Sequence, residues 1–188
     1  MRNIAAQSGL TFQADDDQSA IEEFAIAGMD LLDYQQNSVV NSTVRISFFV
    51  PDSALAKILV KPAEPTVRVA TLEELFKTKC LVSAKRSKTR DWLDLYLLLR
   101  DHGFSIRDFQ HAFQEAGVPM DCARSLSRLC SGVPQRDDEG YAHLLPNPPS
   151  LEQMKSYFIE QRNFLEIEVA ADALRQRQTG DSDHQWTK

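Results

Sequence analysis

The chain has 188 residues, of which 43% are hydrophobic and 26% are charged, and its mean hydropathy is -0.35. This profile is typical of a globular protein and excludes the disordered, collagen-like and coiled-coil classes. The length fits one domain, or one and a fraction, and excludes two full enzyme domains. No apolar run approaches the ~18 residues that a membrane span needs, and Met1 to Gly9 lacks a signal-peptide pattern, so we expect a cytoplasmic protein without membrane contact.

The charge is unevenly distributed along the chain. The net charge of -6 argues against a protein that coats nucleic acid with its whole surface. Six basic residues nevertheless fall between Lys77 and Arg90, without an acidic residue among them. This segment could form a local anion site. The three cysteines have spacings that fit neither a disulfide framework nor a zinc site, so we expect reduced thiols.

The N-terminal third predicts a mixture of strands and helices. Apolar residues at helical spacing predict a helix over 18–36, and alternating β-branched and aromatic residues predict a strand over 43–50. The other predicted elements are a short strand over 10–14, a short helix over 53–60 and a second short strand over 66–70.

The remaining chain predicts helices. Thr71 and Glu74 form a capping box that starts a helix reaching about Lys85, and Ser150 with Gln153 forms a second one. The helices predicted after Lys85 span 90–102, 106–116, 120–131 and 151–178, with a proline-rich loop over 132–149 and a disordered tail over 180–188.

Lys79 is the first candidate functional residue. On the helix that starts at Leu72 it falls within the apolar stripe of Leu72, Leu75, Phe76 and Val82. A lysine that faces inward is snorkelling, paired with a carboxylate, or placed at a cleft, and position alone leaves these alternatives open. Lys77 points elsewhere, and we expect it to be solvated.

The next helix carries a narrow polar stripe on an otherwise apolar surface. Arg90 and Asp94 are four residues apart and could form a surface ion pair. Alternatively, Asp91 or Asp94 meets Lys79 across the helix pair, beside a bound phosphate. The acidic run Asp15 to Asp17 is a weaker candidate for a cation site, for which a solvated turn is the favoured interpretation.

One long segment resembles a known family. From Val67 the chain has V-R-V-A-T-L-E-E-L-F-K-T-K-C-L-V-S-A-K-R-S-K-T-R-D-W-L-D-L-Y-L-L-L, preceded by R-I-S-F-F from Arg45. Both stretches resemble the late conserved region of the AbiEii/AbiGii-type nucleotidyltransferases, which are bacterial abortive-infection and toxin-antitoxin proteins. The resemblance covers about residues 43–104.

The resemblance implies a fold, an activity and a set of residues. It implies a polymerase-β-like nucleotidyltransferase core that uses Mg²⁺ and a nucleoside triphosphate, with RNA as acceptor. The motif lysine matches Lys79, which would contact the triphosphate, and the R-D-x-x-D motif matches Arg90, Asp91 and Asp94. The aspartates would order the site, and the supporting phosphate-binding groups would be Arg86, Lys88 and Arg90.

The Gly-rich turn and D-x-D pair that hold the metals in such enzymes are not found in this sequence. Two interpretations follow: a C-terminal part of a split or truncated enzyme, or a descendant that is kept for binding. The first would need a missing N-terminal half, encoded just before this chain or on a partner. The partners to expect are this missing half or a cognate antitoxin. The second is a non-catalytic module that binds nucleotide, RNA or protein through 77–90. The sequence leaves open whether the chain is an enzyme. A third interpretation is a structural subunit that binds neither nucleotide nor RNA.

The expected fold class is α+β and helix-rich, with a short mixed sheet from a partial nucleotidyltransferase core followed by a C-terminal helical bundle. The expected domains are the partial core at 1–104, a helical region at 105–179 and the tail at 180–188. Apolar surface left uncovered by missing strands would favour a homo-oligomer.

Overall fold

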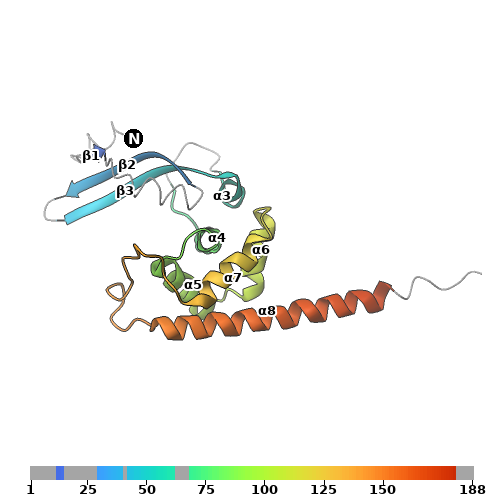
Figure 1. Ribbon diagram of the computed structural model, residues 1–188. Coiled ribbons are helices and arrows are strands. Elements are labelled where there is room, and N and C mark those ends of the chain that lie inside the picture. The colour runs from blue at the N-terminus through green and yellow to red at the C-terminus, as the bar shows by residue number, and fades with distance from the viewer. Residues whose placement is uncertain (1–11, 15–28, 40–41, 62–67, 181–188) are drawn as a thin grey trace, which may run out of the picture. The chain divides into compact units, whose positions relative to one another are not determined.

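The computed structural model describes residues 12–14, 29–39, 42–61 and 68–180 (Figure 1). The chain divides into two compact units, Met1–Arg68 and Val69–Lys188. The predicted boundary at 104/105 lies inside the second unit. Of the tail predicted over 180–188, Gly180 is the last residue of the final helix. Residues 181–188 lie outside the described residues.

The first unit contains an antiparallel sheet of three strands in the order β1-β2-β3. The strands are β1 (Phe12–Ala14), β2 (Met29–Val39) and β3 (Ser42–Pro51). A register shift between Leu31 and Asp33 interrupts the β2–β3 ladder, which is typical of a β-bulge. Helix α3 (Ser53–Ile58) follows at once, because the Asp52 side chain accepts a hydrogen bond from the Leu55 amide at 2.7 Å and caps it.

The helix predicted over 18–36 is wrong in its described part, because residues 29–36 lie in strand β2. The rest of that range lies outside the described residues. Residues 35–37 of β2 pair with β1 on one side and with β3 on the other. Pairing on both edges satisfies the backbone in an extended conformation, which overrides the weak helical periodicity of the segment.

The predicted α+β fold class, with a mixed sheet in a partial polymerase-β-like core, is wrong. From Asp52 to Gly180 the described residues form helices and loops, 66% of this part is helical, and it includes no strand. The strand predicted over 66–70 is wrong in its described part, because residues 68–70 are not in a strand and Val69 is 91% exposed. A strand is stabilised by a buried face, and residues 68–70 are all exposed.

The described part of the second unit contains five helices. They are α4 (Leu72–Ser83), α5 (Thr89–Asp101), α6 (Ile106–Glu115), α7 (Asp121–Ser131) and α8 (Leu151–Gly180). Both predicted capping boxes are confirmed, at Thr71 with Glu74 and at Ser150 with Gln153. A third one, which was not predicted, joins Ser105 and Asp108 at the start of α6.

The apolar side chains of α5 are almost all buried, and α5 packs against α4 and α8. The largest fully buried side chains of the second unit, among its described residues, include Trp92, Phe76, Phe109, Phe113 and Phe158. The apolar stripe predicted on α4 is wrong at its start, because Leu72 and Leu75 are 46% and 41% exposed. The buried face of α4 instead passes through Phe76 and Cys80, because that face packs against α5, α6 and α7.

Candidate functional site

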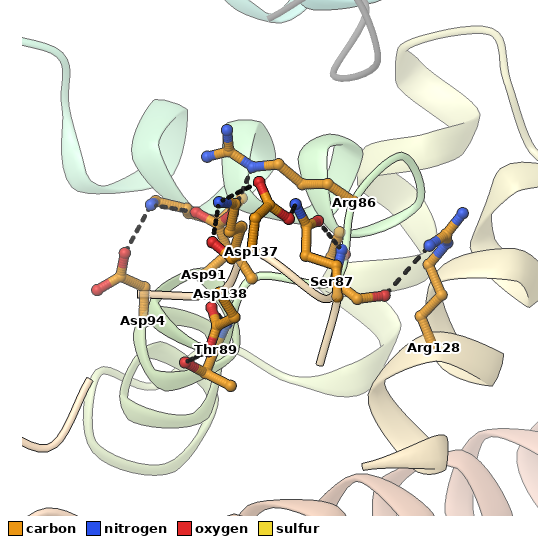
Figure 2. A network of polar contacts seen from close by, with 12 residues as sticks. Arg86, Ser87, Thr89, Asp91, Asp94, Arg128, Asp137 and Asp138 are labelled. Atoms are coloured by element: carbon orange, nitrogen blue, oxygen red, sulfur yellow. Dashed lines mark hydrogen bonds and ion pairs between the residues drawn. The ribbon is translucent and has the colours of Figure 1, made fainter. Parts of the chain in front are cut away.

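Lys79 of α4 lies between two carboxylates of α5. Its Nζ atom donates to Asp91 Oδ1 at 2.7 Å and lies 2.7 Å from Asp94 Oδ2 (Figure 2). Asp91 and Asp94 are three residues apart on α5, so they share one face of that helix. A short turn joins α4 to α5, and it brings this face against α4. The alternative in which Lys79 meets an aspartate across the helix pair is therefore the arrangement that the structure shows.

Asp91 is shared by two cations. Its Oδ1 accepts from Lys79, and its Oδ2 accepts from Arg86 Nε at 2.8 Å. The Asp91 side chain is only 2% exposed. Burial by itself raises the pKa of this carboxyl group, but the charges and hydrogen bonds of Lys79 and Arg86 outweigh it, so the pKa lies below its ordinary value. Asp91 is therefore a buried anion that fixes the positions of both cations.

Lys79 keeps its charge for the same reason. Burial lowers its pKa, whereas the charges of Asp91 and Asp94 raise it, and the balance is a raised pKa. An ammonium group has three N–H donors, and the two carboxylates take two of them. The Lys79 side chain is 21% exposed, so part of it reaches solvent. Asp94, with 40% of its side chain exposed, is the accessible carboxylate of the cluster.

The predicted phosphate-binding residues Lys88 and Arg90 contact a loop that the sequence did not predict as part of the site. Lys88 Nζ lies 3.2 Å from Asp137 Oδ2, and Arg90 Nη2 lies 2.7 Å from Glu139 Oε2. Asp138 accepts from the Thr89 amide at 2.9 Å and from the Thr89 hydroxyl at 2.6 Å. The acidic loop, residues 133–140, therefore covers the N-terminus of α5 (Figure 2).

The same loop is attached to the turn before α5. The Ser87 amide donates to Gln135 Oε1, and the Gln135 amide donates to the Ser87 carbonyl. Arg128 of α7 donates to the Ser87 hydroxyl at 3.1 Å. The signal that could have indicated this loop is its run of three consecutive acids at 137–139, which faces a basic segment about 50 residues earlier in the chain.

The structure differs from two expectations, the alternative in which Arg90 pairs with Asp94 and the solvated position of Lys77. Arg90 contacts Glu139 and the Gly140 carbonyl in place of Asp94, because the acidic loop lies closer to the first turn of α5. Lys77 is not simply solvated: its Nζ lies 2.7 Å from both Glu73 and Glu115, and its side chain is 16% exposed. The run Asp15 to Asp17 lies outside the described residues.

The cysteines are buried and free, as predicted for reduced thiols. Burial raises the pKa of the Cys80 thiol, and it raises that of Cys122 to about 11. A reactive cysteine needs a lowered pKa and access to solvent, so these thiols are structural.

The described residues do not form a metal centre. Within them no group of three or more His, Cys, Asp or Glu side chains could hold a metal ion. Both carboxylate oxygens of Asp91 already accept hydrogen bonds from cations. This donor set does not fit a resident Mg²⁺ ion, because such an ion takes carboxylate oxygens that carry no other cation.

A comparison with known families matches residues 30–177 to the family described as "Nucleotidyl transferase AbiEii toxin, Type IV TA system". The match includes all of the helices from α3 to α7 and almost all of α8. The chain belongs to the AbiEii family. Searches of curated proteins and of solved structures each gave no significant match. No helix in the part of the chain that the structure describes is long and apolar enough to cross a membrane.

AbiEii proteins are nucleotidyltransferase-type toxins of type IV toxin-antitoxin systems. The family resemblance suggested from the stretch of 43–104 is therefore confirmed, and the match extends it to the C-terminal helices. The roles of individual residues are not part of that match and stay predictions.

Proposed function

We propose that this chain transfers a nucleotide from a nucleoside triphosphate to an RNA acceptor. In this reaction a hydroxyl oxygen of the RNA bonds to the α-phosphorus, and the bond from that phosphorus to the bridging oxygen of the β-phosphate breaks. Pyrophosphate leaves, and the hydroxyl proton passes to solvent. The observation that supports the proposal is the Lys79 ammonium group held at 2.7 Å from both Asp91 and Asp94, in a family of nucleotidyltransferase toxins.

Lys79 would contact the triphosphate directly. Its third N–H donor can bind a phosphate oxygen, and the positive charge would stabilise the charge that develops on the leaving pyrophosphate. Asp91 would act as a positioning residue for Lys79 and Arg86, because both of its oxygens are engaged and it is buried. Asp94 would help to orient Lys79 or the acceptor hydroxyl from its exposed position.

Mg²⁺ enters this proposal with the substrate, as the magnesium complex of the triphosphate. The described carboxylates do not fit a resident ion, so no step is assigned to one. The basic residues Arg86, Lys88 and Arg90 would add positive charge around the phosphates. The family is defined by a toxin-antitoxin system, so we expect a cognate antitoxin to be the functional partner.

A second candidate is a non-catalytic module that binds nucleotide or RNA. It is favoured by one observation, the six basic residues that lie between Lys77 and Arg90 without an acidic residue among them. Lys88 and Arg90 would have to leave their ion pairs with Asp137 and Glu139 before they bind a phosphate.

Label transfer from α-³²P-labelled triphosphates to total bacterial RNA in the presence of Mg²⁺ tests the proposal. We expect the wild-type chain to transfer label and Lys79→Met to lose transfer. Lys77→Met is the matched control, because Lys77 lies on the same helix, also contacts two carboxylates and is similarly buried. It should retain transfer.

Equilibrium dialysis with the same labelled triphosphate separates the two candidates. Binding that is lost in Lys79→Met, without label transfer by any variant, would contradict the catalytic proposal and support the binding module. If the wild-type chain neither binds nor transfers label, both candidates fail. Equal loss in Lys77→Met and Lys79→Met would mean that the effect is structural.

A further inference from the structure

The C-terminal half of α8 extends beyond the other helices of the second unit (Figure 1). Helix α8 has 30 residues, whereas α4 to α7 have between 10 and 13. Its side facing the unit buries Met154, Phe158 and Leu165. Beyond Leu165 no further α8 side chain is buried in the part that the structure describes. This half of the helix therefore contributes little to the buried core of the unit.

Apolar side chains continue along this half, on the side away from Phe158 and Leu165. We call the α8 stripe the set Phe164, Ile167, Ala171 and Leu174. Phe164 is 55% exposed, Ile167 is 69% exposed and Leu174 is 59% exposed. Spacings of three, four and three residues place all four on one seam, the a and d positions at which paired helices meet. An exposed apolar row of this kind marks an interaction surface.

Charged side chains hold the neighbouring flank of α8 against the unit. Arg107 of α6 donates to Glu168 at 2.9 Å and also contacts Asp172. These ion pairs fix the rotation of the helix about its axis, with residues 168 and 172 toward α6. The α8 stripe lies beside this flank and is left on the outer side.

We propose that the α8 stripe binds the α8 stripe of a second copy of this chain, with the two helices antiparallel. The spacing is symmetric about residue 169, so an antiparallel partner fits residue by residue. Phe164 then lies opposite Leu174 of the second copy, and Ile167 lies opposite Ala171 of the second copy. The central layers combine a large with a small side chain, as close packing of two helices requires.

The charges at the two ends of the stripe favour the antiparallel orientation. Glu160 lies on the same side of α8 before Phe164, and Arg177 lies just past Leu174; both are exposed. An antiparallel pair brings Glu160 of each copy close to Arg177 of the other. A parallel pair would place glutamate beside glutamate and arginine beside arginine, which is unfavourable.

The pair is expected to be weak. Four seam residues over about three helical turns bury less area than the roughly 1,000 Å² that a stable interface requires. We therefore expect a monomer–dimer equilibrium that depends on concentration. This surface lies on a different helix from Lys79, so the inference does not depend on the proposed activity.

Sedimentation velocity on the full chain, from low to high micromolar concentration, tests the inference. Wild type should shift toward a dimer as the concentration rises, and Ile167→Asp with Leu174→Asp should stay monomeric. The matched control replaces Met120 and Val133 by aspartate, since these residues are 82% and 66% exposed and are not part of the α8 stripe. The control should dimerise as wild type does, and far-UV circular dichroism checks that all variants fold.

A charge exchange tests the orientation without touching the apolar residues. Glu160→Arg alone and Arg177→Glu alone should each weaken the dimer, and the double variant should restore it. A wild-type chain that stays monomeric at every concentration would overturn the inference. So would a control variant that weakens the dimer as much as the stripe variant, or a double variant that fails to recover.

Discussion

Replacing Asp91 by asparagine should destabilise the second unit by about 3 kcal/mol. Asparagine keeps the shape of the side chain but removes the charge that two cations share. The substitution removes the charge from two hydrogen bonds, from Lys79 at 2.7 Å and from Arg86 at 2.8 Å. A hydrogen bond to a charged group contributes about 1.5 to 3 kcal/mol to the free energy of unfolding. We take the lower figure for each, because Lys79 keeps Asp94 and the side chains of Lys79 and Arg86 are 21% and 17% exposed.

The matched control is Asp94→Asn, which removes the other carboxylate from the same lysine. Asp94 makes one such contact and is 40% exposed, so the expected loss is below about 1 kcal/mol. Both variants are measured by urea unfolding, followed by far-UV circular dichroism and by the fluorescence of the buried Trp92. With an m-value of about 1.5 kcal/mol/M, the Asp91 variant should lower the midpoint by about 2 M.

The reasoning fails if Asp91→Asn lowers the midpoint no more than Asp94→Asn does. That result would mean that the buried carboxylate and its two cations contribute no more than a surface ion pair. An unchanged m-value in both variants is required for the comparison, because a changed slope would indicate a different unfolded state.

The remaining predictions concern pH, the acidic loop and the cluster as a unit. The pKa of Asp91 is lowered in the folded protein, so its ion pairs should stabilise the fold above about pH 3.9, and this stabilisation should be lost as the pH falls through the pKa of the folded state. The pKa of Lys79 is raised, so its ion pairs should stabilise the fold below about pH 10.4, and this stabilisation should be lost as the pH rises through the pKa of the folded state. Urea midpoints of wild type and Asp91→Asn should therefore differ most between these limits, and a constant difference down to pH 2 would contradict this. Asp138→Ala should cost about 1 kcal/mol in urea unfolding, because Asp138 caps the Thr89 amide at the start of α5, whereas Glu139→Ala should have little effect. Lys79→Met with Asp91→Leu should recover part of the stability lost in Asp91→Asn, because apolar residues can replace a buried ion pair, while triphosphate binding should stay lost in equilibrium dialysis.

The helices of the second unit could be predicted because their signals are local. Capping boxes at Thr71 and Ser150 define two starts, and Gly103 and Gly132, with φ of 77° and 63°, follow α5 and α7. The strand β2 could not be predicted in this way. Its extended conformation depends on pairing with β1 and β3, and a weak helical periodicity in its own residues carries no information about that pairing.

Part of the candidate site could be predicted because some of its signals are local as well. The position of Lys79 on the inner side of α4, and the spacing of Asp91 and Asp94 on α5, are local patterns that bring the three together once the helices pack. The contacts of Lys88, Thr89 and Arg90 join residues about 50 positions apart, which no local pattern specifies. The acidic loop was therefore missed, and with it the contact of Arg90 with Glu139.

This difference in partners divides the basic segment into two groups with different requirements for phosphate. Lys79 and Arg86 are held by Asp91 from the inner side, so a phosphate could approach Lys79 without breaking the Asp91 contacts. Lys88 and Arg90 instead contact Asp137 and Glu139, whose carboxylates would repel an incoming phosphate. A triphosphate that uses the second group must first displace the acidic loop, which also gives up the cap that Asp138 provides to α5. Asp94 also lies 2.7 Å from Lys79 Nζ, but binding through Lys79 leaves the acidic loop and its cap on α5 in place. This is why Lys79, rather than the more basic stretch after it, is the centre of the proposed site.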